Sequence, residues 1–245
     1  MTEQIPPTAQ PQDRDLAAVA VLIGDPARVA MLTALADGRA LPAGELAQLA
    51  GIRPATASAH LRKLVEGGLV RVRAQGRHRY HELSGPDVGM VLEALAQIAP
   101  PARVRSLRQS HAAIALAEAR TCYDHLAGQR GVQLRDRLLA VGALRMLDDR
   151  DHVLTPLGEE LTADLGIEVG RLSASRRVLA RSCIDWTQRR PHLAGTLPAA
   201  ITAQFLSRGW LSRGSGRSLR VEPGYDRQVD NWLNAFAVQQ CAERR

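Results

Sequence analysis

Between residues 41 and 83 the hydrophobic positions first follow a helical period and then an extended one. Residues 42–50 and 53–66 place apolar side chains three and four positions apart, which is the spacing of helices with one buried face. Gly51 lies between the two segments and allows a sharp turn there. We therefore predict two helices joined by a tight turn.

The residues after the second helix predict a β-hairpin. Glycines at positions 67 and 68 end the helix, and two short runs, 69–73 and 78–83, flank a turn at 74–77. A further helix is expected upstream, because Asp25 is a suitable N-cap and proline follows it at the first helical position.

The predicted second helix carries hydrogen-bond donors, and the predicted hairpin after it carries positive charge. The chain carries a formal charge of +7, and several arginines crowd onto the short hairpin, where they repel one another unless an anion is near. On the helix, Ala57, Leu61 and Leu64 share one face, which leaves small and polar residues on the other. Small residues let a helix approach the major groove, and the polar ones can reach bases or phosphates. We predict binding to double-stranded DNA through Arg53, Thr56, Ser58, Ala59, Arg62, Arg73, Arg77 and Arg79.

These segments resemble the ArsR-type winged-helix repressors. The similar stretches all lie within a predicted domain of residues 13–99, and they are 24–28, 45–47, 56–64, 67–70 and 76–83. The resemblance implies a homodimer formed by the first and last helices of the domain, bound to a near-palindromic operator until an effector arrives. Residues 15–23 and 88–98 are apolar enough to supply that dimer surface. The metal sites best known in the family do not carry over, because residues 44–50 lack cysteine and residues 86–99 lack histidine.

The rest of the chain contains an internal repeat. Residues 119–124 (ARTCYD) return as 180–185 (ARSCID), and 125–128 (HLAG) return as 192–195 at an offset of 192 − 125 = 67. We therefore predict two related units, 102–158 and 169–225. Each is expected to contain a long helix ending in Cys-x-Asp, a Leu-Ala-Gly turn, a second helix and a hairpin.

Each unit also repeats part of the first domain. The spacing Leu-x-x-Gly-x-Leu occurs at 64–69, 139–144 and 206–211, where it predicts a helix, a glycine and a hairpin. The predicted fold is mainly α with small β-hairpins (α+β): a winged helix-turn-helix followed by a mostly helical domain, 102–245, of two duplicated winged-helix-like units about a pseudo-twofold axis. A final helix is expected at 226–239, with Phe205 and Trp210 in the same core, and residues 1–12 are expected to be a disordered arm.

The two predicted downstream hairpins differ in charge at their turns. Residues 148–151 are acidic and would repel a phosphate backbone, whereas residues 213–217 are basic. We expect the basic turn to be a solvated loop rather than a phosphate contact.

The duplication places Cys122 and Cys183 in equivalent positions, and three interpretations stay open. In the first, the cysteines only fill space, with Arg120–Asp124 and Arg181–Asp185 forming i,i+4 ion pairs. Alternatively, Cys122, His125, Cys183 and His192 could bind a soft metal ion, an arsenical or haem. In the third interpretation, an apolar pocket between the units binds an organic effector that Arg, Asp and His side chains orient.

Several classes of protein are not expected. Cysteine with nearby histidine is the minimum for covalent catalysis, but an oxyanion-type glycine loop, a phosphate-binding motif and HExxH are all missing from the sequence. Three cysteines are too few for a disulfide framework, and no apolar run approaches the ~20 residues of a membrane helix. The sequence thus predicts a cytoplasmic, homodimeric transcriptional repressor that responds to a small-molecule or metal effector.

Overall fold

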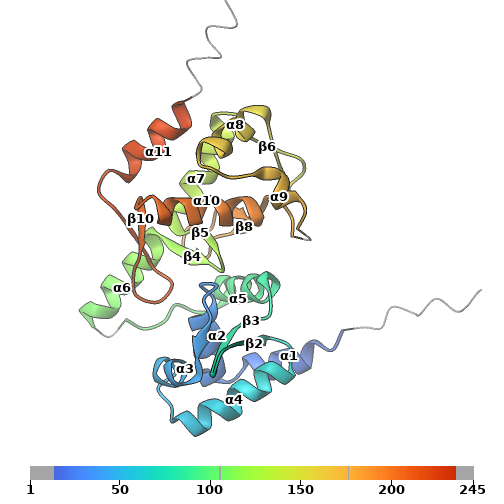
Figure 1. Cartoon of the computed structure of the whole chain (residues 1–245). Coiled ribbons are helices and arrows are strands. Elements are labelled where there is room, and N and C mark those ends of the chain that lie inside the picture. Colours follow the sequence, from blue (N-terminus) through green and yellow to red (C-terminus); the bar gives the residue numbers. More distant parts are fainter. Residues whose placement is uncertain (1–13, 105, 176, 236–245) are drawn as a thin grey trace, which may run out of the picture.

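The first domain packs short helices around a small antiparallel sheet (Figure 1). The computed structural model describes residues 14–104, 106–175 and 177–235. The elements of this domain are α1 (Leu16–Ile23), α2 (Pro26–Leu35), β1 (Leu41–Pro42), α3 (Ala43–Leu49), α4 (Pro54–Glu66), β2 (Val70–Gln75), β3 (His78–Leu83) and α5 (Pro86–Ile98). They form a winged helix-turn-helix, as predicted.

Local sequence signals explain how this domain begins. The side chain of Asp25 accepts a hydrogen bond from the Arg28 backbone N–H at 3.0 Å, so it caps α2 as expected. The buried Arg28 guanidinium donates to the Leu22 and Val21 carbonyl oxygens, at 2.6 and 2.7 Å, and so satisfies the C-terminal end of α1. One side chain therefore fixes α1 against α2.

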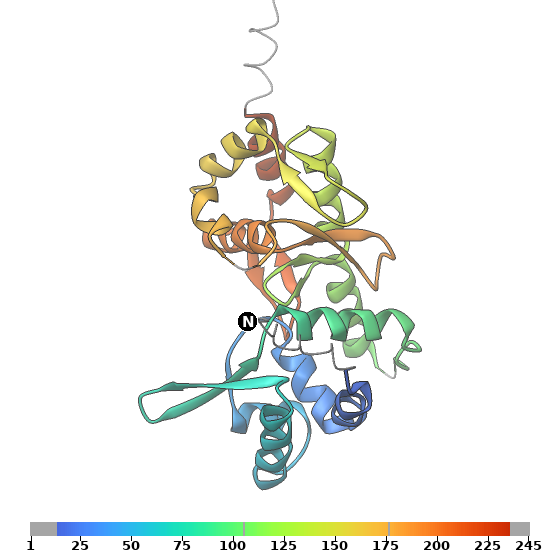
Figure 2. The ribbon, with the colours of Figure 1, turned by 90° about the vertical axis from the view of Figure 1, so that its right-hand side faces the viewer.

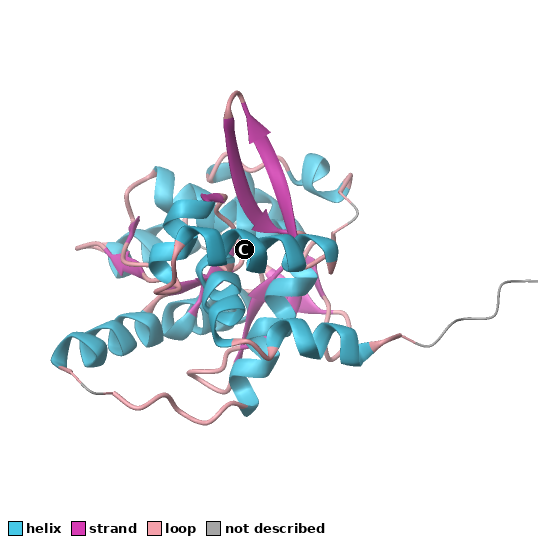
Figure 3. Ribbon diagram, turned by 90° about the horizontal axis from the view of Figure 1, so that it is seen from below, coloured by secondary structure: helices cyan, strands magenta, loops and turns pink. Residues whose placement is uncertain are grey.

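The hairpin is longer than its sequence pattern indicated. Strands β2 and β3 pair from Val70↔Leu83 to Gln75↔His78, and β1 adds a third strand on the other side of β3. The turn is reduced to Gly76 and Arg77, and Gly76 takes the left-handed φ of +57° that a two-residue hairpin turn favours. The result is a ribbon that projects from the body of the molecule, which we call the wing (Figure 3).

The C-terminal domain repeats one order of elements after helix α6 (Leu107–Glu118). The first unit is β4 (Arg120–Cys122), β5 (His125–Ala127), α7 (Gly128–Ala140), β6 (Leu144–Met146), β7 (His152–Leu154) and α8 (Pro156–Asp164). After α9 (Val169–Ser173) the second unit follows as β8 (Arg181–Ile184), β9 (Pro191–Ala194), α10 (Thr196–Ser207), β10 (Leu211–Arg213), β11 (Leu219–Val221) and α11 (Tyr225–Asn234). The predicted duplication and fold class are confirmed.

The two units exchange contacts reciprocally (Figure 2). Helix α7 of the first unit packs on β9 of the second, and α10 packs on β5. The Leu219 N–H donates to the Ala119 carbonyl at 2.8 Å, and the His152 N–H donates to the Ala180 carbonyl, its counterpart, at 2.9 Å. The second hairpin of each unit, β6–β7 or β10–β11, is thus bonded to the strand that carries the cysteine of the other unit.

The expectation of a long helix ending in Cys-x-Asp is wrong. Helix α6 ends at Glu118, Cys122 lies on β4, and Cys183 lies on β8, which follows the short helix α9 rather than a long one. Residues 120–122 are buried one after another, which a helix with a solvent-facing side cannot achieve. A strand paired on one edge with β5 and bonded on the other to the second unit can bury all three.

The Leu-x-x-Gly-x-Leu spacing also aligns the wrong glycine of the first domain, Gly67, with Gly142. The carbonyl of Leu64 accepts from the Leu69 N–H across Gly68, as Leu138 accepts from Ala143 across Gly142. These two glycines have φ of +70° and +77°, the left-handed conformation that ends a helix. The structural equivalent of Gly142 is therefore Gly68 and not Gly67.

Aromatic side chains close the core of the C-terminal domain. Phe205 contacts Trp210 and Trp232, with ring centroids 4.9 and 5.7 Å apart, as expected for the first pair. The indole N–H of Trp232 donates to the Leu161 carbonyl at 2.8 Å and attaches α11 to α8 of the other unit. The predicted extension of the last helix to residue 239, and the predicted arm 1–12, fall outside the described residues.

No described helix alone has the length and apolar composition to cross a bilayer. Helices α1 and α2 have them only together, as a pair that bends by 91°.

Candidate DNA-binding surface and cysteine-histidine cluster

The outer face of α4 is open to solvent. Ala57, Leu61 and Leu64 are buried, so the opposite face carries the predicted contacts. The Ser58 hydroxyl donates to the Pro54 carbonyl at 3.1 Å, which leaves its oxygen lone pairs facing outward. The predicted residues of this helix and its N-cap are all exposed, namely Arg53, Thr56, Ser58, Ala59 and Arg62.

The wing adds exposed positive charge beside this helix. Arg73, Arg77 and Arg79 are exposed and form no ion pair among the described residues. Arg71 differs, because its Nε donates to the Glu82 carboxylate across the ladder at 2.8 Å. The charge available to a phosphate therefore resides on the outer part of the wing.

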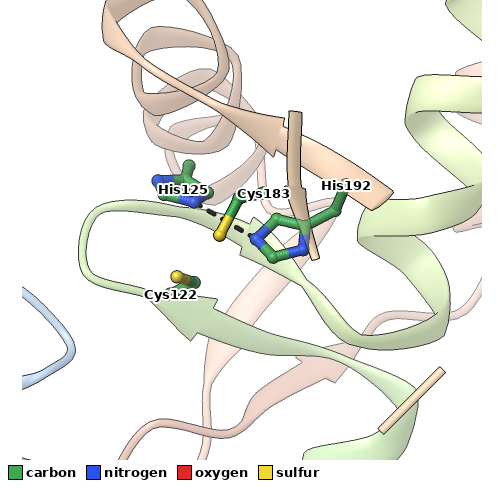
Figure 4. Close-up of side chains that lie close together, drawn as sticks. All are labelled: Cys122, His125, Cys183 and His192. Atoms are coloured by element: carbon green, nitrogen blue, oxygen red, sulfur yellow. Dashed lines mark hydrogen bonds between the residues drawn. The ribbon is translucent and has the colours of Figure 1, made fainter. Parts of the chain in front are cut away.

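The four predicted effector residues meet at one point between the two units (Figure 4). Cys122, His125, Cys183 and His192 come from β4, β5, β8 and β9, and one ligand atom from each lies within 4.8 Å of all the others. The two imidazole Nε2 atoms are 3.3 Å apart. Three of the four residues are buried and Cys183 is half-buried, so the two equivalent cysteines lie together inside the C-terminal domain.

A carboxylate stands behind each imidazole. Asp124 Oδ1 lies 3.4 Å from His125 Nδ1, and Asp185 Oδ2 lies 3.7 Å from His192 Nδ1. These are the aspartates of the two Cys-x-Asp repeats. The repeat thus supplies each half of the cluster with one cysteine, one histidine and one aspartate.

The expected i,i+4 ion pairs Arg120–Asp124 and Arg181–Asp185 do not form. The buried Arg120 donates to Asp185 of the other unit, with a shortest distance of 3.0 Å, and Arg181 lies 3.7 Å from Asp151. Asp124 is instead bound by Arg177, at 2.5 and 3.0 Å. In a helix, side chains four residues apart are neighbours, but these residues lie on extended hairpins that separate them, so their partners come from elsewhere in the chain.

The pKa values of the two cysteines are shifted in opposite directions. The hydrogen bond with Cys122 lowers the pKa of Cys183, and the bonds with both imidazoles add to this effect. The same bond, together with burial, raises the pKa of Cys122. Burial would lower the pKa of His125, but hydrogen bonds with Asp124 and Cys183 outweigh it and raise that pKa. The cluster therefore stabilises one thiolate, which is the form of cysteine that binds metals.

The aspartate behind His192 is held in its charged form. Burial would raise the pKa of Asp185, but the charge of Arg120 and hydrogen bonds from Thr187 and the Gly128 N–H lower it to about 2. A permanent carboxylate thus faces the Nδ1 atom of His192.

The cluster is connected to the DNA-binding domain through α5. Glu93 on α5 is 2% exposed and accepts from Arg120 at 2.8 Å and from Arg217 at 2.6 Å. The Tyr123 N–H, next to Cys122, donates to the Ala36 carbonyl just beyond α2 at 2.9 Å. The expectation that the basic turn at 213–217 is a solvated loop is wrong for Arg217, which is 12% exposed and paired.

Sequence reasoning missed Glu93 and Arg120 as functional candidates. A signal for Glu93 was present, because it is the one charged residue in the largely apolar run 88–98. Arg120 was marked only by its place in the repeated motif, which does not show its partners because both are distant in sequence.

A cavity of 390 Å³ opens beside the cluster, at the junction of the two domains. Cys122 and His125 form part of its wall, and Met90 of α5 and Arg177 lie on other sides. It provides a path by which a ligand could reach the sulfur and nitrogen atoms.

Comparisons with known proteins agree with this architecture. A helix-turn-helix domain family matches residues 23–73. The HTH-type transcriptional regulator YdfF of Bacillus subtilis (strain 168) is 44% identical over 208 residues, which cover 84% of this chain and 92% of that protein. Since 208 residues exceed the length of the first domain, the similarity extends into the duplicated domain.

Solved structures are similar to a little over a third of this chain. One is the homodimeric winged helix-turn-helix domain of Mb0332 from Mycobacterium bovis, a possible ArsR-family regulator (32% identity, 37% of this chain, 88% of that chain, TM-score 0.32). Another is the cadmium sensor CMTR from Mycobacterium tuberculosis (31% identity, 38% and 97% coverage, TM-score 0.31). These TM-scores are low, so family membership rests on the relative that matches most of the chain. The chain belongs to the HTH-type transcriptional regulators, and its DNA-binding domain is a winged helix-turn-helix.

Proposed function

We propose that the protein is a homodimeric repressor that leaves its operator when an effector binds in the C-terminal domain. The observation that carries this proposal is the position of α5 between the two domains (Figures 1 and 2). One side of α5 buries Glu93 against the effector domain, while another side exposes apolar residues. A change at the effector site would therefore be transmitted to the surface that we assign to dimer contact.

The proposed dimer surface is formed by α1 and α5. Large apolar side chains remain exposed on both helices, including Leu16 (76%), Val21 (70%) and Ile98 (81%). An apolar groove of 550 Å³ runs between α2 and α5, and Leu95 and Ile98 line it. Apolar surface of this extent is unusual on a monomer, and a second copy of the same face would cover it.

DNA binding is assigned to α4 and the wing. In the proposed complex α4 enters the major groove, where Thr56 and Ser58 face base edges, and Arg77 at the tip of the wing contacts phosphate. Because the proposed partner is chromosomal DNA, the proposal places the protein in the cytoplasm. We assign it no enzymatic step.

Selection of bound sequences from a random duplex library tests the operator geometry. The proposal predicts two symmetric half-sites whose centres are separated by one helical turn, about 10 base pairs, or a multiple of it. Ser58→Ala should weaken the enrichment. Ser173→Ala should not, although it removes an identical 3.1 Å bond from a serine hydroxyl to a carbonyl four residues earlier. A single asymmetric site, or equal effects of the two variants, would refute the assignment.

Sedimentation of Ile98→Asp tests the dimer. A charge at this 81% exposed position should shift the protein toward monomer, because the interface would bury an unpaired carboxylate. Leu147→Asp is the control, since Leu147 is also exposed, at 61%, and lies next to the acidic turn of the C-terminal domain. A dimer that survives Ile98→Asp unchanged, or a monomeric wild-type chain, would contradict the proposal.

A further inference from the structure

The cysteine-histidine cluster has the composition of a closed metal site. We propose that Cys122, His125, Cys183 and His192 together bind one thiophilic divalent ion of the zinc and cadmium type, and that this ion is the effector. The effector role rests on the repressor function proposed above, whereas the binding site does not. Two thiolates and two imidazoles are a common tetrahedral ligand set for zinc.

The spacing of the two imidazoles fits this coordination. Ligands of a tetrahedral ion are separated by about 1.6 times the bond length, so zinc–nitrogen bonds of about 2.0–2.1 Å place two nitrogens roughly 3.3 Å apart. The Nε2 atoms of His125 and His192 are 3.3 Å apart. Two sulfur ligands of such an ion lie farther apart, at roughly 3.8 Å. The four ligand atoms all lie within 4.8 Å of one another, so side-chain rotations that move them closer by about 1 Å or less would complete the site.

The aspartates explain how the imidazoles would be oriented. Without an ion, the contact between the two Nε2 atoms needs a proton on one of them. An ion bound to both Nε2 atoms moves the protons to Nδ1, where Asp124 and Asp185 stand as acceptors. His192 Nδ1 is buried and has no hydrogen-bond partner in the described structure, and the carboxylate 3.7 Å away would supply one after a small movement. Carboxylates commonly hold metal-binding histidines in this way.

The duplication explains why the ion would act on the whole domain. Each unit supplies one cysteine and one histidine, so the ion would join β4 and β5 of one unit to β8 and β9 of the other. Four protein ligands fill a tetrahedral shell and leave no position for a substrate. The site is therefore suited to sensing or to structure rather than to catalysis.

Two connections lead from the ligands to the DNA-binding domain. Asp185, behind His192, binds Arg120, which binds Glu93 on α5. Cys122 precedes Tyr123, whose N–H donates to the Ala36 carbonyl of the first domain and whose Cβ lies 3.2 Å from the position that a Cβ on Gly89 would take. Closure of the cluster would move both connections, and the 390 Å³ cavity at this junction gives the ion its route of entry.

Cobalt(II) binding to the chelator-treated full chain tests the site. One Co²⁺ per chain should produce intense visible bands of a tetrahedral ion and a near-ultraviolet sulfur-to-cobalt band, which Zn²⁺ then abolishes by displacement. Cys122→Ser and Cys183→Ser should each lose the sulfur band in part, and Cys241→Ser, in the third cysteine of the chain, should retain it. Asp124→Asn keeps all four ligands and should weaken affinity by about 10–100-fold. Circular dichroism of every variant identifies loss of folding.

The same titration carried out on operator complexes tests the effector role. Zn²⁺ or Cd²⁺ should release operator DNA at one ion per chain, and the ion that acts at the lower free concentration identifies the natural class. If the ion binds with tetrahedral spectra and operator affinity stays unchanged, the effector role is wrong while the site stands. If no tetrahedral spectrum forms, or if both serine variants bind Co²⁺ like wild type, the site itself is refuted. Failure of the ion-free protein to select any operator refutes the repressor function instead.

Discussion

Glu93 binds two arginines of the neighbouring domain, and replacing it with glutamine tests whether this contact stabilises the molecule. Glu93 is 2% exposed and pairs with Arg120, which is fully buried, and with Arg217, which is 12% exposed. Together with Asp185 the four groups have no net charge. Glu93→Gln keeps the shape of the side chain but leaves one positive charge without compensation.

The expected cost follows from what each arginine can do after the change. Removing one partner from a buried ion pair typically costs about 3–5 kcal/mol. Arg217 can turn toward water, and Arg120 keeps Asp185, so we expect the lower end, about 3 kcal/mol. For a chain of this length each kcal/mol shifts Tm by about 2–4 °C, which gives a fall of about 6–12 °C.

Differential scanning calorimetry of the two proteins at equal concentration measures this shift. Glu66→Gln is the matched control, because Glu66 pairs with Arg62 at 4.0 Å on the surface, with both side chains about 70% exposed. That pair should contribute about 0–1 kcal/mol and shift Tm by no more than about 4 °C. If Glu93→Gln melts within the range of its control, the domains are not joined by a buried ionic contact, and the reasoning is wrong.

Two further changes test the wing and the repeated hairpins. Arg77→Ala should reduce the slope of log affinity against log salt by about one unit, as expected for a lost phosphate contact, and Arg71→Ala should reduce it less because Glu82 already neutralises Arg71; equal slopes for the two variants would contradict the assignment. Gly128→Ala should destabilise the chain by more than Gly142→Ala in urea unfolding. Both glycines have φ of +77°, a conformation that costs an L residue about 1–2 kcal/mol. A Cβ on Gly128 would also meet two carbonyl oxygens, at 2.9 and 3.0 Å, whereas a Cβ on Gly142 would meet open space. Equal losses would show that the close approach at Gly128 carries no penalty.

Local signals predicted the first domain well. The N-cap at Asp25, the glycines around α4 and the alternation along the wing act over a few residues, so the sequence alone indicates them. The constant offset of the repeat also predicted that Cys122 and Cys183 occupy equivalent places. That prediction required no knowledge of the fold, because duplicated units tend to pack symmetrically.

Other parts depend on contacts that no local pattern contains. Strand β4 has only three residues, too few to show a period, and its extended form depends on β5 and on the hairpin of the second unit. Because neither contact is visible in the local sequence, a helix was predicted there instead of a strand. The partners of Glu93 are 27 and 124 residues away, so its buried network appears only when the two domains are placed together.

Coupling between the cluster and the operator is tested most directly by measuring one affinity in two states. The Zn²⁺ affinity of the free chain and of the chain saturated with operator DNA can be compared at fixed salt and pH by competition with a chelator. Because linkage is reciprocal, Zn²⁺ should bind the operator complex more weakly by the same factor by which it weakens DNA binding, and about 5–150-fold is typical of such coupling. Equal Zn²⁺ affinities in the two states would contradict metal-controlled release.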